Sequence, residues 1–146
     1  MKWQIISIGK PALSWAKSAT EDYLKRLKRG AQVEMISLRD GTPAQIAERT
    51  TTASEGTLRI VLDERGKNMT SAGLAAWIAR QHLAGTKRVS IIIGGASGHP
   101  DEVRAVADEM WCLSALTLQH EMALVLFLEQ LYRAHSILRG DPYHRA

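Results

Sequence analysis

The sequence predicts an α/β fold: a mainly parallel sheet with helices on both faces. Short apolar, β-branched runs alternate along the chain with longer segments whose apolar residues recur at helical spacing. This alternation is typical of strand–helix–strand units, whose crossover helices cover both faces of a parallel sheet. No internal repeat, linker or low-complexity segment interrupts the 146 residues. Residues 1–146 are therefore predicted to form a single domain.

The first three elements are a strand, a helix and a strand. Trp3–Ile8 is a short, mostly apolar run that ends at Gly9, which predicts a strand. Leu13–Leu27 carries apolar residues every three or four positions and predicts a helix, with Gly30 where a C-terminal cap belongs. Val33–Leu38 is then expected to form the second strand.

A second helix and a third strand follow. Thr42 and Pro43 form a typical helix start, an N-cap residue followed by proline at the first helical position. That helix fades into the polar stretch at residues 50–54. Leu58–Leu62 is an apolar run that predicts a buried strand, and Asp63–Lys67 after it predicts a polar turn.

The middle of the chain repeats the pattern. Ser71 is expected to cap a helix that runs to about Ala84 and ends at Gly85. Val89–Ile93 is β-branched almost throughout and is the most strand-like segment of the chain. His99–Glu102 is expected to open another helix, because two acidic residues in its first turn favour the helix dipole.

The last strand and the last helix complete the predicted domain. A short strand is expected around Met110–Leu113, followed by a loop to His120. A long helix then runs to about Leu138. The tail cannot continue this helix past Pro142, which lacks a backbone N–H.

Composition limits the classes of protein that this chain can represent. The single cysteine, Cys112, excludes a disulfide framework and is best interpreted as a small buried hydrophobic residue. The longest apolar run, Met122–Leu128, is far shorter than the ~20 residues of a membrane span, and Met1–Gly9 does not resemble a secretory leader. We therefore expect a cytoplasmic protein with no membrane partner. The formal charge of +4 permits a nucleic-acid partner without requiring one.

Three loops are predicted at the carboxyl edge of the sheet, where open parallel sheets bind ligands. They are residues 63–67, 94–98 and 114–120. Gly94, Gly95 and Gly98 suit either close approach to a ligand or simply a tight turn, and the residues alone leave both readings open. No Gly-Lys-Ser/Thr phosphate loop is present, and the five histidines lack paired metal-ligand spacing, so no metal is predicted.

The end of the chain carries residues that a passive tail does not need. Tyr143, His144 and Arg145 place an aromatic ring, a titratable base and a permanent cation side by side. Such a set can stack on a base, move a proton and hold a phosphate. The alternative is a tail that only packs against the body of the protein.

Five motifs in this order resemble the ribosomal RNA large subunit methyltransferase H family of the SPOUT superfamily. They are Leu62–Lys67, Ile93–Gly98, Leu113–His120, Glu129–Ala134 and Pro142–Arg145, and they span essentially the whole chain. The resemblance implies a C-terminal deep trefoil knot and a homodimer whose substrate site forms where the protomers meet. It implies methylation of N3 of pseudouridine 1915, in helix 69 of 23S rRNA, on the assembled 70S ribosome. The methyl donor would be S-adenosylmethionine, with S-adenosylhomocysteine as product and no metal.

The resemblance also assigns roles to residues. It places the methyl donor against the third and fourth strand ends and the loop after the fifth strand: Leu62, Gly94, Gly95, Leu113, Ser114, Ala115, Leu116, Thr117 and Leu118. His144 is the expected general base, with Tyr143, Arg145 and Arg133 as the other catalytic residues. His120, Arg133, Tyr143 and Arg145 are expected to bind substrate, although His120 is equally compatible with a structural role.

Two positions depart from the family pattern. Leu124 stands where the family usually carries an arginine, which suggests one positive charge fewer at the entrance to the last helix. Ala146 replaces a polar or acidic last residue. The Leu124 departure favours an alternative reading, a non-catalytic ribosome-binding or assembly factor that keeps the knotted fold. A further alternative, an α/β nucleotide-binding enzyme unrelated to RNA, leaves the tail residues unexplained.

Overall fold

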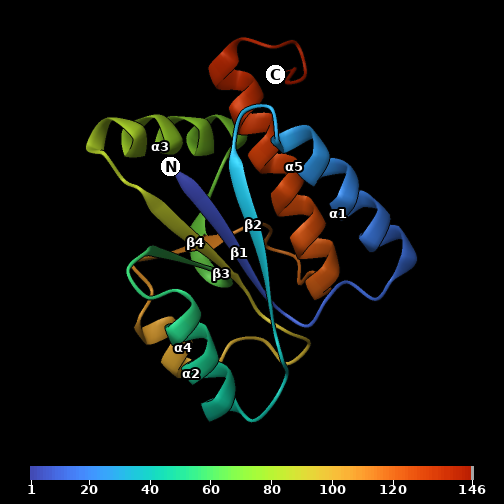
Figure 1. Cartoon of the computed structure of the whole chain (residues 1–146), viewed down its shortest axis with the longest axis vertical. Coiled ribbons are helices and arrows are strands. Elements are labelled where there is room, and N and C mark those ends of the chain that lie inside the picture. The colour runs from blue at the N-terminus through green and yellow to red at the C-terminus, as the bar shows by residue number, and fades with distance from the viewer. Residues whose placement is uncertain (146) are drawn as a thin grey trace.

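A computed structural model describes residues 1–145 and shows a five-stranded parallel sheet in the order β2-β1-β4-β3-β5 (Figure 1). The predicted parallel α/β fold is therefore confirmed. Ala146, one of the two departures from the family pattern, lies outside the described residues. The strands are β1 (Lys2–Ile8), β2 (Gln32–Leu38), β3 (Leu58–Asn68), β4 (Arg88–Ile93) and β5 (Glu109–Cys112).

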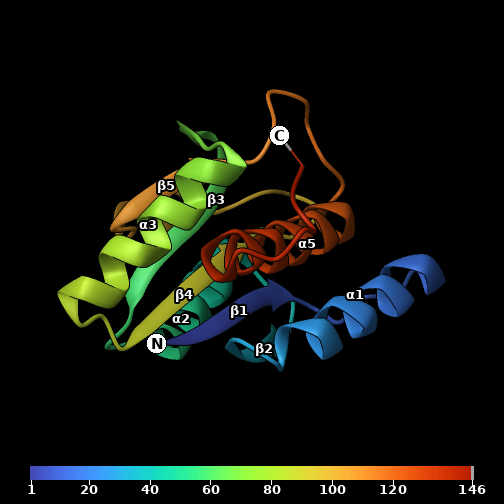
Figure 2. The same cartoon turned by 90° about the horizontal axis from the view of Figure 1, so that it is seen from above.

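Helices cover both faces of this sheet, as predicted. Figure 2 shows α1, α3 and α5 on one side of the strands and α2 on the other, and α4 packs against α2. The helices are α1 (Ser14–Leu27), α2 (Pro43–Ala53), α3 (Ser71–Ala84), α4 (Asp101–Ala105) and α5 (His120–Arg139). None of the helices among residues 1–145 is both long and apolar enough to cross a membrane.

The central strands are apolar on both sides because helices cover both sides. Ile5 of β1 pairs with Ile91 of β4, which pairs in turn with Ile60 of β3, and none of the three side chains is exposed. The next position along each strand faces the opposite layer. Alternate residues of each strand therefore belong to two separate hydrophobic cores, and the larger core lies under α1, α3 and α5. This explains why continuous apolar runs, and not alternating ones, identify these strands.

The helix ends follow the predicted chemistry with two corrections. Thr42 caps α2 through a capping box with Gln45, and Gly85 ends α3 in the left-handed conformation with φ of 77°, both as predicted. The cap of α3 is Thr70 and not Ser71, because the Thr70 hydroxyl accepts the Gly73 N–H at 2.9 Å. Gly30 is not a left-handed cap; α1 ends at Lys28 in right-handed conformation.

Residues 63–67 form an irregular part of β3 and not a simple turn. Leu62 and Lys67 both pair with Trp111 of β5, so the segment between them bulges out of the strand. Gly66 permits this because a Cβ there would come within 2.5 Å of the Met110 carbonyl carbon. The turn-forming residues were identified correctly, since the Asp63 carboxylate accepts the Arg65 N–H at 2.9 Å, but β3 resumes its pairing beyond them.

The start of α1 is capped by a residue from the other end of the chain. Its N-cap residue, Leu13, offers no side-chain acceptor. Glu121, which is 7% exposed at the start of α5, accepts the backbone N–H groups of Ala12 and Leu13, the latter at 3.1 Å. A carboxylate at this position satisfies orphan donors and favours the helix dipole. The contact fixes the starts of α1 and α5 relative to each other.

Candidate functional site

A cavity of about 220 Å³ lies where Leu62–Glu64 of β3, at the start of the bulge, and the carboxyl end of β4 meet the loop after β5. Ligand sites of open parallel sheets are found in this position. The cavity is lined by nearly all the residues assigned to the methyl donor from sequence: Leu62, Gly94, Gly95, Leu113, Ser114, Leu116, Thr117 and Leu118. Ala115 alone among them does not line it. His120 also lines the cavity, from the first position of α5.

The walls of this cavity are mostly apolar. Leu62 and Ile93, at the ends of two buried strands, contribute the inner wall and are 8% and 3% exposed. Leu116 forms part of the outer rim, and its side chain is 76% exposed. A flat apolar ligand that covers this leucine would remove apolar surface from water, which favours binding.

The glycine loop is shaped by its own packing. A Cβ on Gly94 would meet the Gly98 backbone at 3.2 Å and the His99 ring at 3.3 Å. A Cβ on Gly95 would meet the side chain of Ile8 at 3.3 Å. Gly95 and Gly98 form a bridge, and Gly98 has φ of 78°. These contacts support the tight-turn interpretation, and the backbone of the turn lines the cavity, so close approach of a ligand to Gly94 and Gly95 stays a prediction.

A charged pair closes one side of the cavity. Arg104 Nε donates to Asp63 Oδ2 at 2.8 Å, and the Asp63 side chain is 6% exposed. Burial opposes ionisation of Asp63, but the Arg65 N–H and the Arg104 guanidinium outweigh it and hold the pKa of this carboxyl below its usual value. The pair therefore stays ionised, with each charge largely offset by the other.

His99 stands beside this pair as a neutral group. Its Nε2 lies 2.9 Å from the Leu62 carbonyl oxygen, which can only accept, so this nitrogen carries the proton. Burial lowers the pKa of His99 and outweighs the opposing effects of that hydrogen bond and of Asp63. His99 thus ties β3 to the glycine loop without adding a positive charge to the cavity.

The loop after β5 is held by short-range hydrogen bonds. Ser114 Oγ accepts the Leu116 N–H at 3.0 Å, and the Ser114 carbonyl accepts the thiol of Cys112 at 3.0 Å. Cys112 is buried, as expected for a structural residue. The Thr117 hydroxyl donates to Glu64 Oε2 at 3.3 Å, which links this loop to the bulge of β3. Two loops predicted at one edge of the sheet are thereby in direct contact.

The residues predicted at the C-terminus gather around one carboxylate that carried no predicted role. Glu129 Oε1 accepts from Arg133 Nη2 at 2.6 Å, from Arg133 Nε at 3.0 Å and from the Tyr143 hydroxyl at 2.9 Å. Arg133 Nη1 also lies 3.2 Å from His144 Nδ1. Since a guanidinium only donates, His144 Nδ1 is the acceptor, and a neutral His144 ring carries its proton on Nε2. Arg145 is exposed beside them.

A second tyrosine completes the cluster. The Tyr23 hydroxyl of α1 lies 3.2 Å from that of Tyr143. Because the Tyr143 proton points to Glu129, Tyr23 must be the donor in this pair. Burial, together with these two hydrogen bonds, raises the pKa of the Tyr143 phenol, which therefore stays protonated. Tyr132 packs edge-on against Tyr143 with ring centroids 4.7 Å apart, and the Arg133 guanidinium lies 4.8 Å from the Tyr143 ring centroid.

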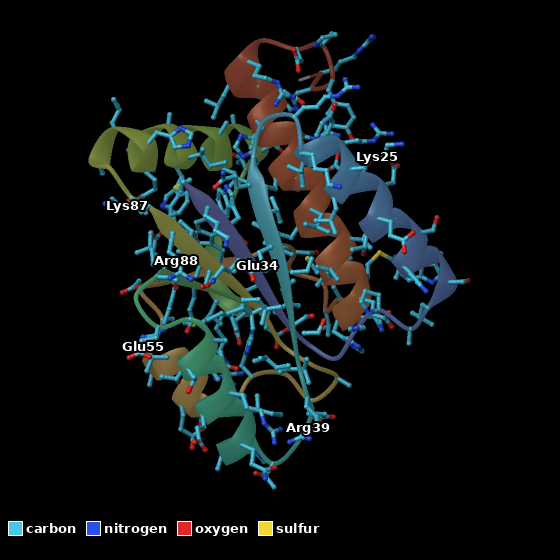
Figure 3. The ribbon with its side chains drawn as sticks, in the orientation of Figure 1. Lys25, Glu34, Arg39, Glu55, Lys87 and Arg88 are labelled. Carbon is cyan, nitrogen blue, oxygen red and sulfur yellow. The ribbon has the colours of Figure 1, made fainter. Side chains whose placement is uncertain are left out.

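The tail cluster and the cavity are separate within one chain. Tyr143, His144, Arg145 and Arg133 do not line the cavity. His120, at the cavity, precedes Glu129 by nine residues along α5, a rise of about 13 Å. Figure 3 shows the tail at the end of the molecule that carries Lys25 of α1. The structure thus brings the predicted site residues together in two groups and not in one.

Leu124 is a buried residue. Its side chain is 2% exposed and belongs to the core under α1, α3 and α5. Leu124 also lines a small pocket with Gly94 and His120 at the start of α5, so the effect of the missing positive charge on RNA docking stays a prediction.

Sequence reasoning missed Tyr23, Glu129, Asp63 and His99. In the sequence Tyr23 counts only as an apolar residue of a helix, and Glu129 belongs to a motif that assigns it no role. Their contacts span up to 120 residues of chain, which helical spacing does not encode. Among residues 1–145, no three His, Cys, Asp or Glu side chains group closely enough to hold a metal ion.

The chain matches a known protein family over almost its whole length. Residues 1–144 match the family described as "Predicted SPOUT methyltransferase". The chain is 42% identical over 147 residues to "Ribosomal RNA large subunit methyltransferase H" of Polynucleobacter asymbioticus, and 40% identical over 146 residues to that of Thermus thermophilus. In both pairs 99% of each chain is covered.

Solved structures share the fold at much lower identity. A probable methylase family protein from Haemophilus influenzae aligns with a TM-score of 0.58 at 15% identity, covering 99% of this chain and 70% of that one. A putative methylase family protein from Neisseria gonorrhoeae gives a TM-score of 0.57 at 14% identity, covering 99% and 88%. At these identities the likeness concerns the fold alone.

Proposed function

Because the chain belongs to the ribosomal RNA large subunit methyltransferase H family of SPOUT methyltransferases, we propose that it methylates large-subunit ribosomal RNA. The proposed acceptor is N3 of pseudouridine 1915 in helix 69, within the assembled 70S ribosome. The observation that carries the proposal is the cavity at the carboxyl edge of the sheet, where motifs from three strand ends meet.

The residues of this cavity fit S-adenosylmethionine. Leu62, Ile93 and the exposed Leu116 offer apolar walls for a purine ring, and the loop backbone offers hydrogen bonds. The donor, when bound, supplies a methyl group that is already activated on a positively charged sulfur. The neutral His99 and the paired Arg104 would add little positive charge to a cavity that holds such a donor.

The tail of a second subunit is the proposed source of the remaining groups. Tail and cavity lie apart in one chain, so a target base at the cavity needs a tail from elsewhere. Exposed apolar side chains at the starts of α1 and α5, namely Leu13, Trp15 and Met122, are 40%, 44% and 42% exposed. The Glu121 contact holds these two helix starts together, so the three side chains form a candidate homodimer contact.

The proposed proton transfer uses His144 and Arg133 in sequence. The lone pair of a neutral His144 is on Nδ1, which Arg133 occupies. His144 therefore accepts the N3 proton only after Arg133 has turned away. Arg133 is then free to stabilise the developing negative charge on the base. Tyr143 stays protonated and supplies a ring on which the base can stack.

The direct test is transfer of labelled methyl from S-adenosylmethionine to 70S ribosomes that lack this modification. We expect label at the helix 69 loop, and little on free large-subunit RNA. Ribosomes that carry uridine in place of the pseudouridine show whether the isomerised base is required. His144→Ala is expected to abolish transfer while donor binding, followed by calorimetry, is retained. Donor binding without any transfer by the unaltered protein would contradict the proposed activity.

A mixing experiment tests the shared site. Leu116→Asp alters the cavity and leaves the tail intact, whereas His144→Ala does the reverse. Equal mixing of the two inactive proteins gives about one half heterodimers, each with one site built from an intact cavity and an intact tail. We expect about a quarter of normal activity after subunit exchange. Absence of recovery, with exchange demonstrated, would place the whole site within one chain.

A further inference from the structure

The Gly66-Lys67 part of the first motif has no role in the cavity. Lys67 follows the bulge of β3 and pairs with Trp111, so its side chain lies beyond the donor cavity. It lines a separate groove of about 510 Å³. The groove runs between the last residues of β3, one side of α3 and the start of β5, elements that lie side by side in Figure 2.

Two cations line this groove without partners of their own. Lys67 and Arg80 are both exposed. Within the described residues 1–145, neither side chain makes an ion pair or a hydrogen bond. Most other arginines that line the sites above are engaged, as Arg104 is with Asp63 and Arg133 with Glu129. The charges of Lys67 and Arg80 are therefore available to an external anion.

Among the described residues, one acidic side chain, Glu109, lines the groove, and two buried indoles at the base of the groove hold it by hydrogen bonds. Glu109 accepts from Trp77 Nε1 at 3.0 Å through one carboxylate oxygen and from Trp111 Nε1 at 3.1 Å through the other. The two indoles are 4% and 1% exposed and meet edge to face with centroids 4.8 Å apart. The carboxylate is thus fixed at the base of the groove and offset by two N–H dipoles. It does not pair with either cation.

The groove also offers neutral donors and a helix terminus. Asn68 and Gln81 line it, and the Gln81 amide oxygen is already used by the Thr86 hydroxyl at 2.6 Å, which leaves its NH₂ group to donate. Thr70, the N-cap residue of the fourteen-residue α3, and Gly73, in its first turn, lie on the same side. The positive end of the helix dipole adds to the two cations.

We propose that this groove binds the sugar-phosphate backbone of the RNA strand beside the target nucleotide, an inference that rests on the proposed function. Spaced, exposed cations along a groove suit a repeating polyanion better than one small phosphate, which needs a converging set of donors. Lys67 is five residues from Leu62 on the same strand, at most about 17 Å away. A strand whose target base reaches the cavity can therefore lay its neighbouring phosphates in the groove.

The test is the salt dependence of binding to 70S ribosomes. A double variant, Lys67→Gln with Arg80→Gln, removes both cations from exposed positions. Each cation that no longer neutralises a phosphate is expected to make the slope of log affinity against log salt less steep by about 1, so the double change amounts to about 2. The KM for ribosomes should rise at unchanged kcat. Lys67→Arg, which keeps both charges of the groove, should keep the normal slope.

A matched control removes two charges that do not line the groove. Lys87 and Arg88 are exposed before and at the start of β4, where Figure 3 labels them. Lys87→Gln with Arg88→Gln should leave slope and KM close to normal. If the groove variant keeps the normal slope, or changes it no more than this control does, the groove proposal is wrong.

The two proposals fail in different ways. If the groove variant binds ribosomes more weakly but the unaltered protein transfers no methyl group, the proposed activity is wrong and the groove proposal stands. Normal methyl transfer with an unchanged salt slope in the groove variant would overturn the groove alone. An unaltered protein that does not bind ribosomes overturns both.

Discussion

Glu129 is the residue on which the tail cluster depends, and Glu129→Gln is the sharpest test of that cluster. One oxygen, Oε1, receives two hydrogen bonds from Arg133 and one from Tyr143. The amide is isosteric with the carboxylate but has no charge and keeps one acceptor. The substitution therefore removes the charge-assisted part of three contacts without creating a cavity.

The magnitude follows from exposure. A hydrogen bond to a charged group contributes about 1.5–3 kcal/mol, but the side chains of Glu129 and Arg133 are 19% and 25% exposed, so water replaces part of it. We expect the docked tail to lose about 2 kcal/mol, which is roughly a thirtyfold shift toward the undocked state. The midpoint of global unfolding should move little, because none of the described tail residues 140–145 belongs to either hydrophobic core.

Hydrogen exchange of residues 140–145 measures this shift directly. Exchange in Glu129→Gln should be faster by about an order of magnitude or more, and methyl transfer should fall with it. Donor affinity should not change, since Glu129 does not line the cavity. The control is Glu34→Gln, which removes an exposed pair with Lys2 whose side chains are 44% and 47% exposed. Equal exchange rates in the two variants would refute the role given to Glu129.

Three further changes test the fold beneath the site. Gly66→Ala should destabilise the protein by several kcal/mol in denaturant unfolding, because its Cβ would come within 2.5 Å of Met110. Glu121→Gln should cost about 1–2 kcal/mol by weakening the cap at Leu13, measured the same way. Burial lowers the pKa of His135 to about 4. The free energy of unfolding of the protein should therefore fall by up to about 3 kcal/mol as pH falls from about 6.5 toward 4. His135→Phe should flatten this dependence on pH.

The sign of the His135 effect follows from which state binds the proton. The unfolded side chain titrates near 6.5 and the folded one near 4, so between these values the unfolded state holds more protons. Stability therefore rises with pH through that window.

Gly85→Ala is the control for Gly66→Ala, because a Cβ on Gly85 would meet nothing within 4 Å and only the positive φ of Gly85 adds strain. A loss at Gly85 as large as that at Gly66 would contradict the packing argument.

Local signals in the sequence predicted local structure well. The Thr42-Pro43 start and the Gly85 end of their helices depend on residues within four positions of each other, and both were confirmed. The simple turn predicted at residues 63–67 was wrong for the opposite reason. Gly66 is constrained by Met110, forty-four residues later, and no local pattern reports which strand will pair there.

In the candidate site, too, the residues that motifs identify were predicted and the long-range contacts were missed. Motifs placed the cavity residues correctly on the carboxyl edge because parallel strands bring their ends to one side. The cap that Glu121 provides for α1 and the hydrogen bond from Tyr23 to Tyr143 join opposite ends of the chain. Both depend on the packing of α1 against α5, which periodicity does not specify. The deep knot implied by the family resemblance stays a prediction.

One helix connects these parts, and its rigidity constrains how the site can work. The buried face of α5, from Leu124 to Ala134, fixes the rotation of the helix against the sheet. With that rotation set, His120 must face the cavity and Glu129 must hold the tail, about 13 Å further along. A hydrogen-bonded helix does not shorten, so the two groups of residues in one chain cannot close on the same nucleotide by bending α5. Either the tail leaves Glu129 during each reaction, or the tail of a second copy supplies what the cavity lacks. The hydrogen-bond network that holds the tail in place favours the second arrangement.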